Sequence, residues 1–270
     1  MNTDKIPFVK YHGTGNDFVI IDHTEKQYLD PNNYDLIAAI CHRRFGIGAD
    51  GLMIIEKPSN ELHNFEMLYF NSDGKPSTMC GNGGRCITAA FLKRSEHKEQ
   101  SNLTFSFQNQ TYQSTFNKEN GWIKLQMQNV SFIEITSAGY ILDTGSPHLV
   151  QFNDEVNSID VKKQGSVLRY SERFQEEGIN VNFCAWNKNE LSVRTYERGV
   201  ENETYSCGTG VVASSISYAL KAQPPDGNIT IPISTRGGRL SVSFQRNGSR
   251  FTDIALSGPT VKICEGYYYV

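Results

Sequence analysis

Two short segments of the chain each place a cysteine directly before glycines and an apolar run. Residues 80–84 read Cys-Gly-Asn-Gly-Gly, residues 207–210 read Cys-Gly-Thr-Gly, and each segment leads into a stretch typical of an apolar helix. A cysteine at the start of a helix lies beside free backbone N–H groups and the positive end of the helix dipole. This environment lowers the pKa of a thiol and can also bind an anion, such as a carboxylate.

Two such cysteines acting on one substrate would form an acid–base pair for moving a proton across a carbon atom. The thiolate of one cysteine would remove the α-proton of an amino acid, and the thiol of the other would return a proton to the opposite face. This exchange inverts the configuration and requires no cofactor. Oriented backbone N–H groups would bind the substrate carboxylate and stabilise the negative charge that develops as the proton leaves. The residues that carry these groups are Gly81, Asn82, Gly208 and Thr209.

The segments around the cysteines occur twice in the chain. Thr-Gly-Asn at residue 14 returns as Thr-Gly-Ser at residue 144, and Gly-Ile-Gly at residue 46 returns as Gly-Ile-Asn at residue 178. A tyrosine and a polar residue precede the second cysteine (Tyr196 and Arg198) as they precede the first (Tyr69 and Asn71). Three landmarks in the same order, 127 to 132 residues apart, indicate an internal duplication. If the two halves face each other, both helix dipoles are directed at one substrate.

Each cysteine helix is expected to be enclosed by a sheet. The run VVASSISYAL after the second loop carries no charged residue, and neither does the run between Arg85 and Lys93 after the first. A helix without a polar face must be covered on nearly all sides. Segments that predict strands are residues 52–56, 64–71, 102–127, 228–244 and 251–270. The predicted fold class is α+β, with two pseudo-symmetric halves, each a curled mixed or antiparallel sheet around a central helix.

Four local patterns refine this prediction. Residues 32–44 predict a further helix, capped by Asn32 or Asn33 and ended by Gly46. The following GIGADG matches a nucleotide-binding G-x-G-x-x-G pattern in form, but that fingerprint follows a strand and opens a helix, whereas this one follows a helix and opens a strand. We therefore interpret it as a tight turn. Asn120-Gly121 predicts a hairpin turn, and residues 128–140 predict a crossing into the second half.

Composition limits the partners and the location of the protein. Apolar residues at 38% and charged residues at 20% are typical of a soluble globular chain, and a net charge of −3 favours neither nucleic acid nor an anionic membrane. The first residues do not resemble a secretion signal, which predicts a cytoplasmic protein. The six cysteines lack Cys-x-x-Cys spacing, so we expect free thiols and no metal site. Small core residues are the interpretation of Cys41, Cys86, Cys184 and Cys264.

The motifs taken together resemble those of the diaminopimelate epimerase family. CGNGGR and CGTG occur with HGTGNDF, FNSDG, SPH and YERG, in the family's order and through nearly the whole chain. The resemblance implies cofactor-independent epimerisation of LL-2,6-diaminopimelate to meso-diaminopimelate, on the route to lysine and peptidoglycan, by a cytoplasmic homodimer. It also implies that the C-terminal residues return to the first half, which gives residues 1–126 plus 259–270 and residues 127–258.

The same resemblance assigns roles to individual residues. It implies that Cys80 and Cys207 are the catalytic thiols and that His148 and Glu197 assist proton transfer. The positions that match substrate contacts are Asn16, Asn71, Asn180, Glu197 and Arg198. A buried Arg198 would bind a distal carboxylate through two parallel hydrogen bonds. The chain departs from the family at Ser146, where many members have asparagine, and at Gly51, where some have glutamine.

Other functions remain open at this point. An epimerase or racemase of the same fold could act on histidine, proline or hydroxyproline, although Arg198 and Asn71 favour a substrate with a charged far end. A hydrolase or transferase could use one cysteine as nucleophile with His148 as base, but it would leave the second Cys-Gly-x-Gly loop unexplained. A binding protein without catalysis would need neither thiol.

Overall fold

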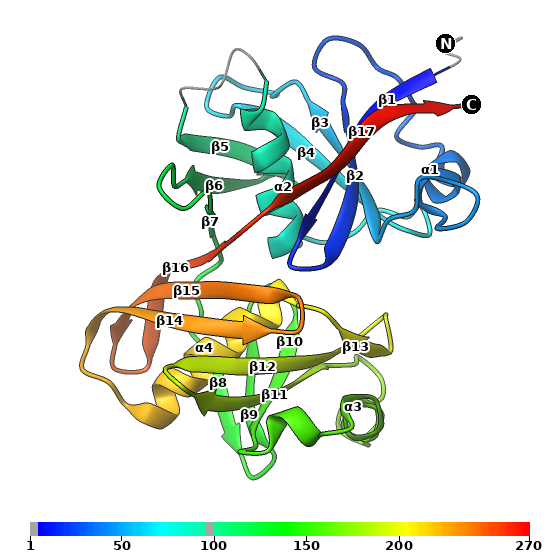
Figure 1. Cartoon of the computed structure of the whole chain (residues 1–270). Coiled ribbons are helices and arrows are strands. Elements are labelled where there is room, and N and C mark those ends of the chain that lie inside the picture. Colours follow the sequence, from blue (N-terminus) through cyan, green and yellow to red (C-terminus); the bar gives the residue numbers. More distant parts are fainter. Residues whose placement is uncertain (1–4, 95–99) are drawn as a thin grey trace. The chain divides into compact units, whose positions relative to one another are not determined.

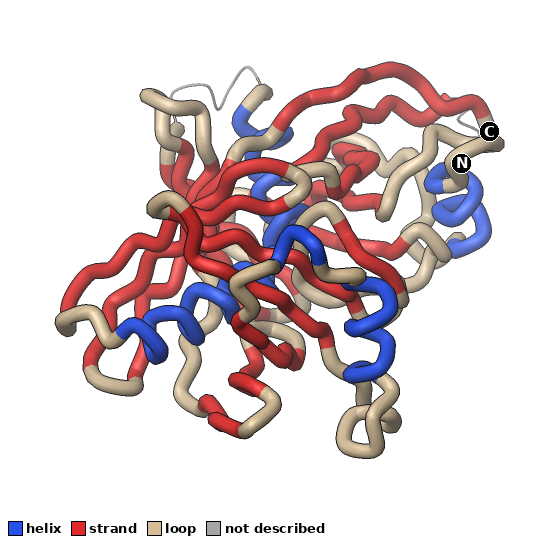
Figure 2. Tube along the Cα trace, turned by 60° about the horizontal axis from the view of Figure 1, so that its bottom comes forward, coloured by secondary structure: helices blue, strands red, loops and turns tan. Residues whose placement is uncertain are grey.

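The chain is described by a computed structural model over residues 5–94 and 100–270, and it divides into two units (Figure 1). The first unit comprises Met1–Leu125 and Pro259–Val270, and the second comprises Gln126–Gly258. Strands dominate the described residues, and few helices accompany them (Figure 2). No helix in these residues is long and apolar enough to span a membrane.

The described residues of the first unit form one sheet of eight strands in which the C-terminal strand pairs with the N-terminal one. The strand order is β17-β1-β2-β3-β4-β5-β6-β7. The β2–β3 and β4–β5 pairs are parallel, and the other five pairs are antiparallel. The strand bounds are β1 Lys5–Gly13, β2 Asn16–Asp22, β3 Gly51–Glu56, β4 Phe65–Asn71, β5 Asn102–Phe107, β6 Gln110–Phe116, β7 Ile123–Gln126 and β17 Val261–Tyr269.

The second unit repeats this topology. Its strand order is β8-β9-β10-β11-β12-β14-β15-β16, with parallel β10–β11 and β12–β14 pairs at the same places in the order. A short β13 adds to β12. The strand bounds are β8 Ile133–Thr136, β9 Gly139–Asp143, β10 Pro147–Phe152, β11 Asn180–Asn187, β12 Glu190–Glu197, β13 Asn202–Thr204, β14 Gly227–Thr235, β15 Gly238–Asn247 and β16 Arg250–Gly258. The predicted α+β class with two pseudo-symmetric halves is confirmed.

Helices connect the parallel strands, as the geometry of a parallel pair requires. Helix α1 (Tyr34–Cys41) joins β2 to β3, and α2 (Gly81–Leu92) joins β4 to β5. In the second unit α3 (Val161–Arg169) and α4 (Gly208–Ala222) occupy the same places in the topology. The first residues of α2 and α4 directly follow the two cysteines. All but one of the residues of α2 are buried, which agrees with the absence of charge in its apolar run.

The two faces of each sheet carry different side chains because strand residues alternate between faces. In the first unit Val19, Leu52 and Phe70 belong to the core cluster that includes the α1 residues Ile37 and Ile40. In the second unit Leu149, Val181 and Tyr196 belong to a cluster that includes Val161 of α3. The residues between these positions lie on the opposite face, which is the face that carries α2 or α4.

Several local predictions are confirmed and others are wrong. Asn33 caps α1 by accepting a hydrogen bond from the Leu36 N–H at 3.1 Å, but α1 ends at Cys41 and does not reach residue 44. The apolar run predicted a helix from Arg85 to about Lys93, and α2 begins four residues earlier, at Gly81. The turn before β3 and the Asn120-Gly121 turn between β6 and β7 are present. Residues 128–140 include all of β8 and the start of β9, and are therefore not a simple crossing.

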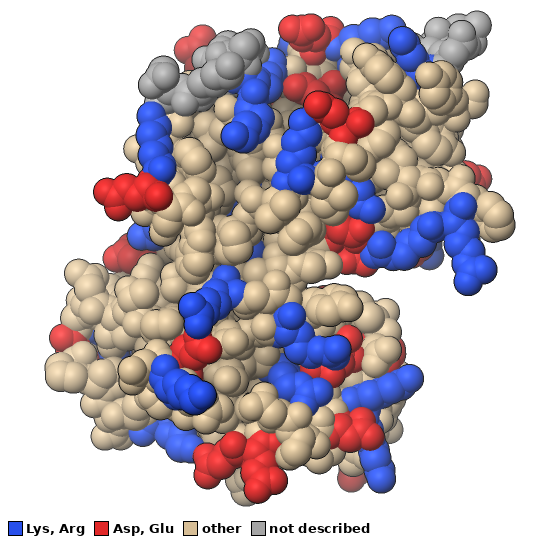
Figure 3. Space-filling view, in the orientation of Figure 1, with Lys and Arg blue, Asp and Glu red and all other residues tan. Residues whose placement is uncertain are grey.

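Charged side chains of both signs are mixed on the visible surface (Figure 3). Basic and acidic groups lie beside one another on the face shown of each unit, as a net charge of −3 allows. Ion pairs account for part of this mixing, among them Arg173 with Glu134 at 2.5 Å and Arg236 with Glu203 at 3.0 Å. The view gives no sign of the broad basic surface that nucleic acid would require.

Candidate active site

Both cysteines are the N-cap residues of their helices. The backbone of Cys80 is extended before α2 (φ −114°, ψ 120°), and that of Cys207 is nearly the same before α4 (φ −102°, ψ 114°). Each thiol therefore lies at the positive end of a helix, beside backbone N–H groups that have no partner within the helix. Cys80 is partly exposed and Cys207 is 6% exposed. The predicted location of the two thiols at helix N-termini is thus present in both units.

Asparagine side chains surround Cys80 in the first unit. The Cys80 thiol donates to Asn16 Oδ1 at 3.5 Å, and the Gly83 N–H donates to Cys80 Sγ at the same distance. Asn82, which is 1% exposed, donates through Nδ2 to Asn16 Oδ1 at 3.4 Å. Asn16 Nδ2 donates to Asp50 Oδ2 at 2.8 Å, so its carbonyl oxygen faces Cys80. The structure thus brings Asn16 and Asn82 together with the first thiol.

A salt-bridge network holds Asp50 in place behind Asn16. Arg43 donates to both Asp17 and Asp50, and Lys10 pairs with Asp17 at 2.9 Å. Burial raises the pKa of the Asp17 carboxyl, but the hydrogen bonds and charges of Arg43 and Lys10 outweigh it and lower that pKa overall. Asp17 is therefore ionised near neutral pH. Motif reasoning did not identify this support, because Asp17, Arg43 and Asp50 lie in three separate segments.

A buried arginine lies one helical turn beyond Cys80. Arg85 is fully buried and donates to Asn82 Oδ1 at 2.9 Å and to the Gly81 carbonyl at 3.1 Å. Burial lowers the pKa of its guanidinium, and the nearby Cys86 and Cys80 partly offset this effect. Arg85 Nε has no hydrogen-bond partner among the described residues. A positive charge buried this close to Cys80 favours the thiolate, and sequence reasoning missed it although it lies within the CGNGGR motif.

Replacing this charge is expected to reduce the reactivity of Cys80. In Arg85→Met the alkylation of Cys80 by iodoacetamide at neutral pH slows about tenfold, since loss of the adjacent cation destabilises the reactive thiolate. Peptide mass spectrometry measures the rate at each cysteine separately. Cys207, in the other unit, is the internal control and keeps its rate. An unchanged Cys80 rate would show that the helix N-terminus alone activates this thiol.

In the second unit, polar residues from three strands lie on the face that carries α4. His148 (β10) pairs with Asn180 (β11), and Asn182 lies two residues further along β11 on the same face. Thr195 and Glu197 (β12) also alternate onto this face, because Tyr196 between them packs in the opposite core. His148, Asn182 and Thr195 are 0%, 0% and 3% exposed.

Hydrogen bonds connect these residues to the second thiol. Cys207 Sγ lies 3.4 Å from Thr209 Oγ1, and Thr209 Oγ1 lies 2.9 Å from His148 Nε2. Ser146 Oγ is 3.0 Å from the same nitrogen and 3.1 Å from Thr209 Oγ1. Burial, with a smaller effect of the Arg198 charge, lowers the pKa of His148 to about 3, so the imidazole is neutral. His148 therefore reaches Cys207 through Thr209 within this unit.

Asn180 is well positioned, whereas Arg198 is more open than predicted. Asn180 Nδ2 donates to Ser146 Oγ at 3.2 Å and to the Pro147 carbonyl at 3.0 Å, and its Oδ1 accepts from the Arg198 N–H at 2.9 Å. Arg198 is exposed, so the expectation that it is buried is wrong. Its Nη1 donates to the Glu177 carbonyl at 2.8 Å. This bond holds the side chain in place, but an uncharged carbonyl does not neutralise the guanidinium. Glu197 is half-buried.

The paired registers define which residues correspond in the two units. Phe18 pairs with Gly51 in the first unit as His148 pairs with Asn180 in the second. From these pairs, Met53 corresponds to Asn182, Tyr69 to Thr195 and Asn71 to Glu197. The predicted match of Tyr196 with Tyr69 is therefore wrong by one residue. The match of Asn180 with Gly48 is also wrong, since Asn180 corresponds to Gly51.

Two glycines support this register independently. A Cβ added to Gly83 of α2 would collide with Met53 Cε, and a Cβ added to Gly210 of α4 would collide with Asn182 Oδ1. Each helix thus begins in close contact with the corresponding residue of its sheet. Gly51 is equally confined, because a Cβ there would lie 2.5 Å from the Phe70 carbonyl oxygen. A side chain such as the glutamine of some family members does not fit at Gly51 without a backbone shift.

The remaining four cysteines are also free. Burial raises the pKa of Cys41 and of Cys184 to about 12, and it also raises that of Cys86. These three thiols stay protonated and pack as small core residues, as predicted. Cys264 is exposed on β17, so its prediction as a core residue is wrong.

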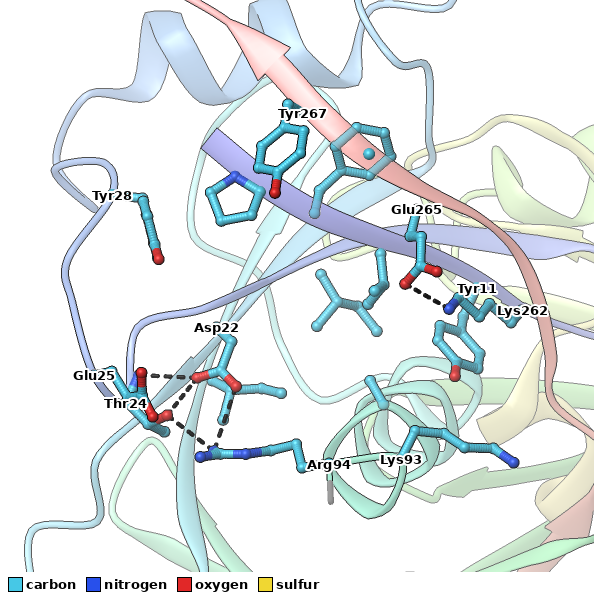
Figure 4. Close-up of a pocket in the computed structure, with 17 residues that line it drawn as sticks. Tyr11, Asp22, Thr24, Glu25, Tyr28, Lys93, Arg94, Lys262, Glu265 and Tyr267 are labelled. Atoms are coloured by element: carbon cyan, nitrogen blue, oxygen red, sulfur yellow. Dashed lines mark hydrogen bonds and ion pairs between the residues drawn. The ribbon is translucent and has the colours of Figure 1, made fainter. Parts of the chain in front are cut away.

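A cavity of about 830 Å³ in the first unit lies apart from the candidate site (Figure 4). Strands β1, β2 and β17 and the end of α2 contribute its lining, which includes neither Cys80 nor Asn16. Charged groups on its wall pair with each other: Arg94 with Asp22 at 3.3 Å, and Lys262 with Glu265 at 2.7 Å. These pairings oppose selective capture of a charged amino acid, so we do not place the chemistry there.

Comparisons with known sequences agree with this geometry. The family model described as diaminopimelate epimerase matches residues 8–133 and 140–263. A diaminopimelate epimerase of Flavobacterium psychrophilum is 46% identical over 257 residues, which cover 95% of this chain and 97% of that protein. A diaminopimelate epimerase of Methanocella arvoryzae is 36% identical, over 97% of this chain and 96% of that protein.

Solved structures share the fold at much lower identity. A Bacillus anthracis phenazine biosynthesis protein of the PhzF family has a TM-score of 0.77 at 14% identity, over 99% of this chain and 100% of that chain. A hydroxyproline epimerase from Agrobacterium vitis, solved with bound trans-4-hydroxy-L-proline, has a TM-score of 0.70 at 11% identity, over 99% and 93%. These two likenesses concern the fold alone. On the family model and the sequence relatives, the chain belongs to the diaminopimelate epimerase family.

Proposed function

We propose that the protein converts LL-2,6-diaminopimelate to meso-diaminopimelate by exchanging the proton on one α-carbon between two cysteines. The observation that carries this proposal is the equivalent position of Cys80 and Cys207, each the N-cap of a buried helix at the same place in a repeated topology. Family membership supports the substrate. A single nucleophilic cysteine would need only one of these two arrangements.

The surroundings of the two thiols allow each to act as acid or as base. Asn16 Oδ1 accepts a hydrogen bond from the Cys80 thiol, which favours the protonated form, whereas the Gly83 N–H and buried Arg85 favour its thiolate. Thr209 presents a hydroxyl to Cys207 Sγ at 3.4 Å, and a hydroxyl that donates there favours the thiolate. Proton transfer through the substrate exchanges these states, and the epimerisation then runs in either direction. We assign the catalytic role to the two thiols.

The substrate carboxylate would bind at the helix N-termini. Backbone N–H groups of Gly81, Asn82, Gly208 and Thr209 belong to the first turns of α2 and α4, where such groups lack partners within the helix. The same dipoles stabilise the carbanion-like transition state as the α-proton leaves. Neutral His148 and half-buried Glu197 support proton transfer from the sheet face that carries α4.

Polar residues at the ends of the strands would bind the distal part of the substrate. Arg198 carries a charged guanidinium that can pair with the distal carboxylate, and Asn71 and Asn180 can bind the ammonium groups or carboxylates. Asn180 already holds the Arg198 backbone in place. Asn16 and Asn71 would contact the substrate from the first unit, and Asn180, Glu197 and Arg198 from the second. The enzyme would act as a cytoplasmic homodimer in lysine and peptidoglycan precursor biosynthesis, with no cofactor, nucleic acid or membrane partner.

The second candidate is an amino-acid racemase or epimerase of the same fold with another substrate. Structures titled hydroxyproline epimerase and probable proline racemase share the fold at TM-scores of 0.70 and 0.69. Proline and hydroxyproline have no charged far end, so they would leave Arg198 without a ligand. Exposed Arg198 with its charge unneutralised therefore favours diaminopimelate over these substrates.

Exchange with heavy water tests the proposed reaction. Incubation of LL- or meso-diaminopimelate in D₂O is expected to place deuterium at an α-carbon as the two epimers interconvert, measured by NMR and mass spectrometry. The equilibrium mixture should form from either epimer. Interconversion without deuterium uptake would exclude a thiol-mediated proton exchange, and no conversion of either epimer would exclude the substrate.

Turnover is expected to survive the removal of metals and of carbonyl cofactors. EDTA and hydroxylamine should leave the rate unchanged, because the motifs contain no lysine for a Schiff base and no cysteine spacing typical of zinc. Iodoacetamide should abolish the rate, because a thiolate at a helix N-terminus is a good nucleophile. Initial rates before and after each treatment are the measurement. Reversible loss with EDTA, restored by a metal ion, would contradict this mechanism.

A further inference from the structure

A buried polar network lies beside the N-terminus of α4 at positions where the first unit has apolar or aromatic side chains. His148, Asn182 and Thr195 correspond to Phe18, Met53 and Tyr69. The first unit shows that the fold packs these positions without the imidazole or the amide. Burying polar groups costs free energy unless every hydrogen bond is made. The network in the second unit therefore serves something other than packing.

The direction of each hydrogen bond in this network can be derived. Asn182 faces the Leu149 carbonyl at 3.2 Å, and a carbonyl only accepts, so the atom facing it is the amide nitrogen Nδ2. The Thr195 hydroxyl donates to Asn182 Oδ1 at 2.9 Å and holds the amide from the other side. Asn182 Nδ2 also lies 3.0 Å from His148 Nδ1. Since Nδ2 donates, His148 Nδ1 must accept.

We propose that Asn182 is a positioning residue that fixes His148 as the neutral tautomer with its proton on Nε2. His148 Nε2 then donates to Thr209 Oγ1 at 2.9 Å and to Ser146 Oγ at 3.0 Å. Thr209 accepts from the imidazole and directs its own proton toward Cys207 Sγ at 3.4 Å. The amide of Asn182 thus determines that the hydroxyl beside Cys207 donates and thereby stabilises the thiolate.

This assignment gives His148 a specific role in the resting enzyme. A neutral imidazole with its proton on Nε2 donates a hydrogen bond and does not accept the proton that Cys207 exchanges. Burial keeps the imidazole neutral at neutral pH. Gly210 lets α4 begin against Asn182, because any Cβ there would collide with Asn182 Oδ1. The inference rests on the proposed function only for the role of Cys207, since the tautomer itself is independent of the substrate.

Nitrogen NMR of the wild-type protein tests the tautomer directly. With ¹⁵N-labelled histidine, His148 should show an unprotonated Nδ1 and a protonated Nε2 at neutral pH, assigned by loss of its signals in His148→Gln. These signals should stay unchanged from pH 8 to pH 5, where exposed histidines titrate. A protonated Nδ1 or an imidazolium at neutral pH would overturn the proposal without any variant of Asn182.

Two substitutions of Asn182 separate the proposed role from a structural one. Asn182→Asp keeps the shape but replaces the donor by an acceptor, so His148 Nδ1 should become protonated. Asn182→Leu removes the donor, and Cys207 should react with iodoacetamide about tenfold more slowly at neutral pH, as expected for loss of one hydrogen bond to a charged group. Thr195→Val removes the hydroxyl that holds the Asn182 amide. The His148 tautomer and the Cys207 alkylation rate should both change in the same direction as in Asn182→Leu.

Control variants distinguish a specific effect of this network from a general loss of folded structure. Ser217→Ala removes a buried hydroxyl that donates within α4 to the Ala213 carbonyl at 2.9 Å, and should leave the tautomer and the Cys207 rate unchanged. Cys80 in the same proteins should keep its alkylation rate. If Asn182→Asp left Nδ1 unprotonated, or Asn182→Leu left the Cys207 rate unchanged, the proposal would be wrong. If both readouts change as stated but diaminopimelate is not a substrate, only the proposed function fails.

Discussion

Cys80→Ala and Cys207→Ala are each expected to lose nearly all epimerisation of diaminopimelate. Each thiol serves one face of the α-carbon, so removal of either leaves one proton transfer without a group to perform it. A positioned acid or base contributes roughly 10²- to 10⁴-fold, and kcat should fall by at least that factor in each variant. Initial rates from LL- and from meso-diaminopimelate, measured separately, test both directions.

The matched controls for these variants are cysteines with a different environment. Cys184→Ala removes a buried thiol of the second unit whose pKa is raised to about 12, and it should leave kcat nearly unchanged. Cys264→Ala does the same at an exposed position on β17. Circular dichroism and thermal unfolding show whether each variant is folded. Full turnover in a folded Cys80→Ala or Cys207→Ala protein would refute the two-thiol mechanism.

The repeated architecture was accessible from sequence because its signals are local. An uncharged apolar run after each Cys-Gly segment predicted an enclosed helix, and α2 and α4 are such helices. The duplication was detectable because the turns before β2 and β10 retain Thr-Gly, which positive φ angles at Gly15 and Gly145 favour. Residues next to a motif were therefore placed correctly, including Asn82 and Thr209 beside the two thiols.

The registers between paired strands were harder to predict from the sequence than the repeated architecture. A shift of one residue moves every side chain to the other face of a sheet, and a motif alignment does not contain that constraint. It therefore matched Tyr196 with Tyr69, although Tyr196 packs on the face opposite α4. The same limit hid Asn182 and Thr195, whose roles depend on pairing between β10, β11 and β12. Asp50 and Arg43 were missed because they support Asn16 only in the folded chain.

The exposure of Arg198 also depends on the fold and not on the motif. YERG places an arginine after β12, but burial depends on what covers the end of that strand. In the structure the guanidinium is exposed and donates to the Glu177 carbonyl. A free, charged group at this place can pair with an incoming carboxylate at a lower desolvation cost than a buried one. Arg198 is thus better suited to select a substrate than to stabilise the fold.

Arg198→Met is expected to lower kcat/KM for LL-diaminopimelate roughly 10- to 100-fold, as for the loss of one hydrogen bond to a charged group. The thiols should still react with iodoacetamide, because the helix N-termini at which they lie do not depend on Arg198, whose Nη1 donates to the Glu177 carbonyl. Arg198→Lys should recover only part of the loss, since an ammonium cannot make two parallel bonds to a carboxylate. Arg173→Met, which removes an exposed arginine paired with Glu134, is the matched control and should leave kcat/KM unchanged.

A comparison of four substrates tests whether Arg198 binds a distal carboxylate. The wild-type enzyme should epimerise diaminopimelate and not lysine, which has the same chain and far ammonium group but lacks the distal carboxylate. The measurement is kcat/KM for LL-diaminopimelate, lysine, histidine and proline on wild type and Arg198→Met. Loss of the arginine should reduce the preference for diaminopimelate over lysine, because the discriminating charge is gone. If the wild type prefers histidine or proline, the two-thiol mechanism stands, but Arg198 does not bind a distal carboxylate.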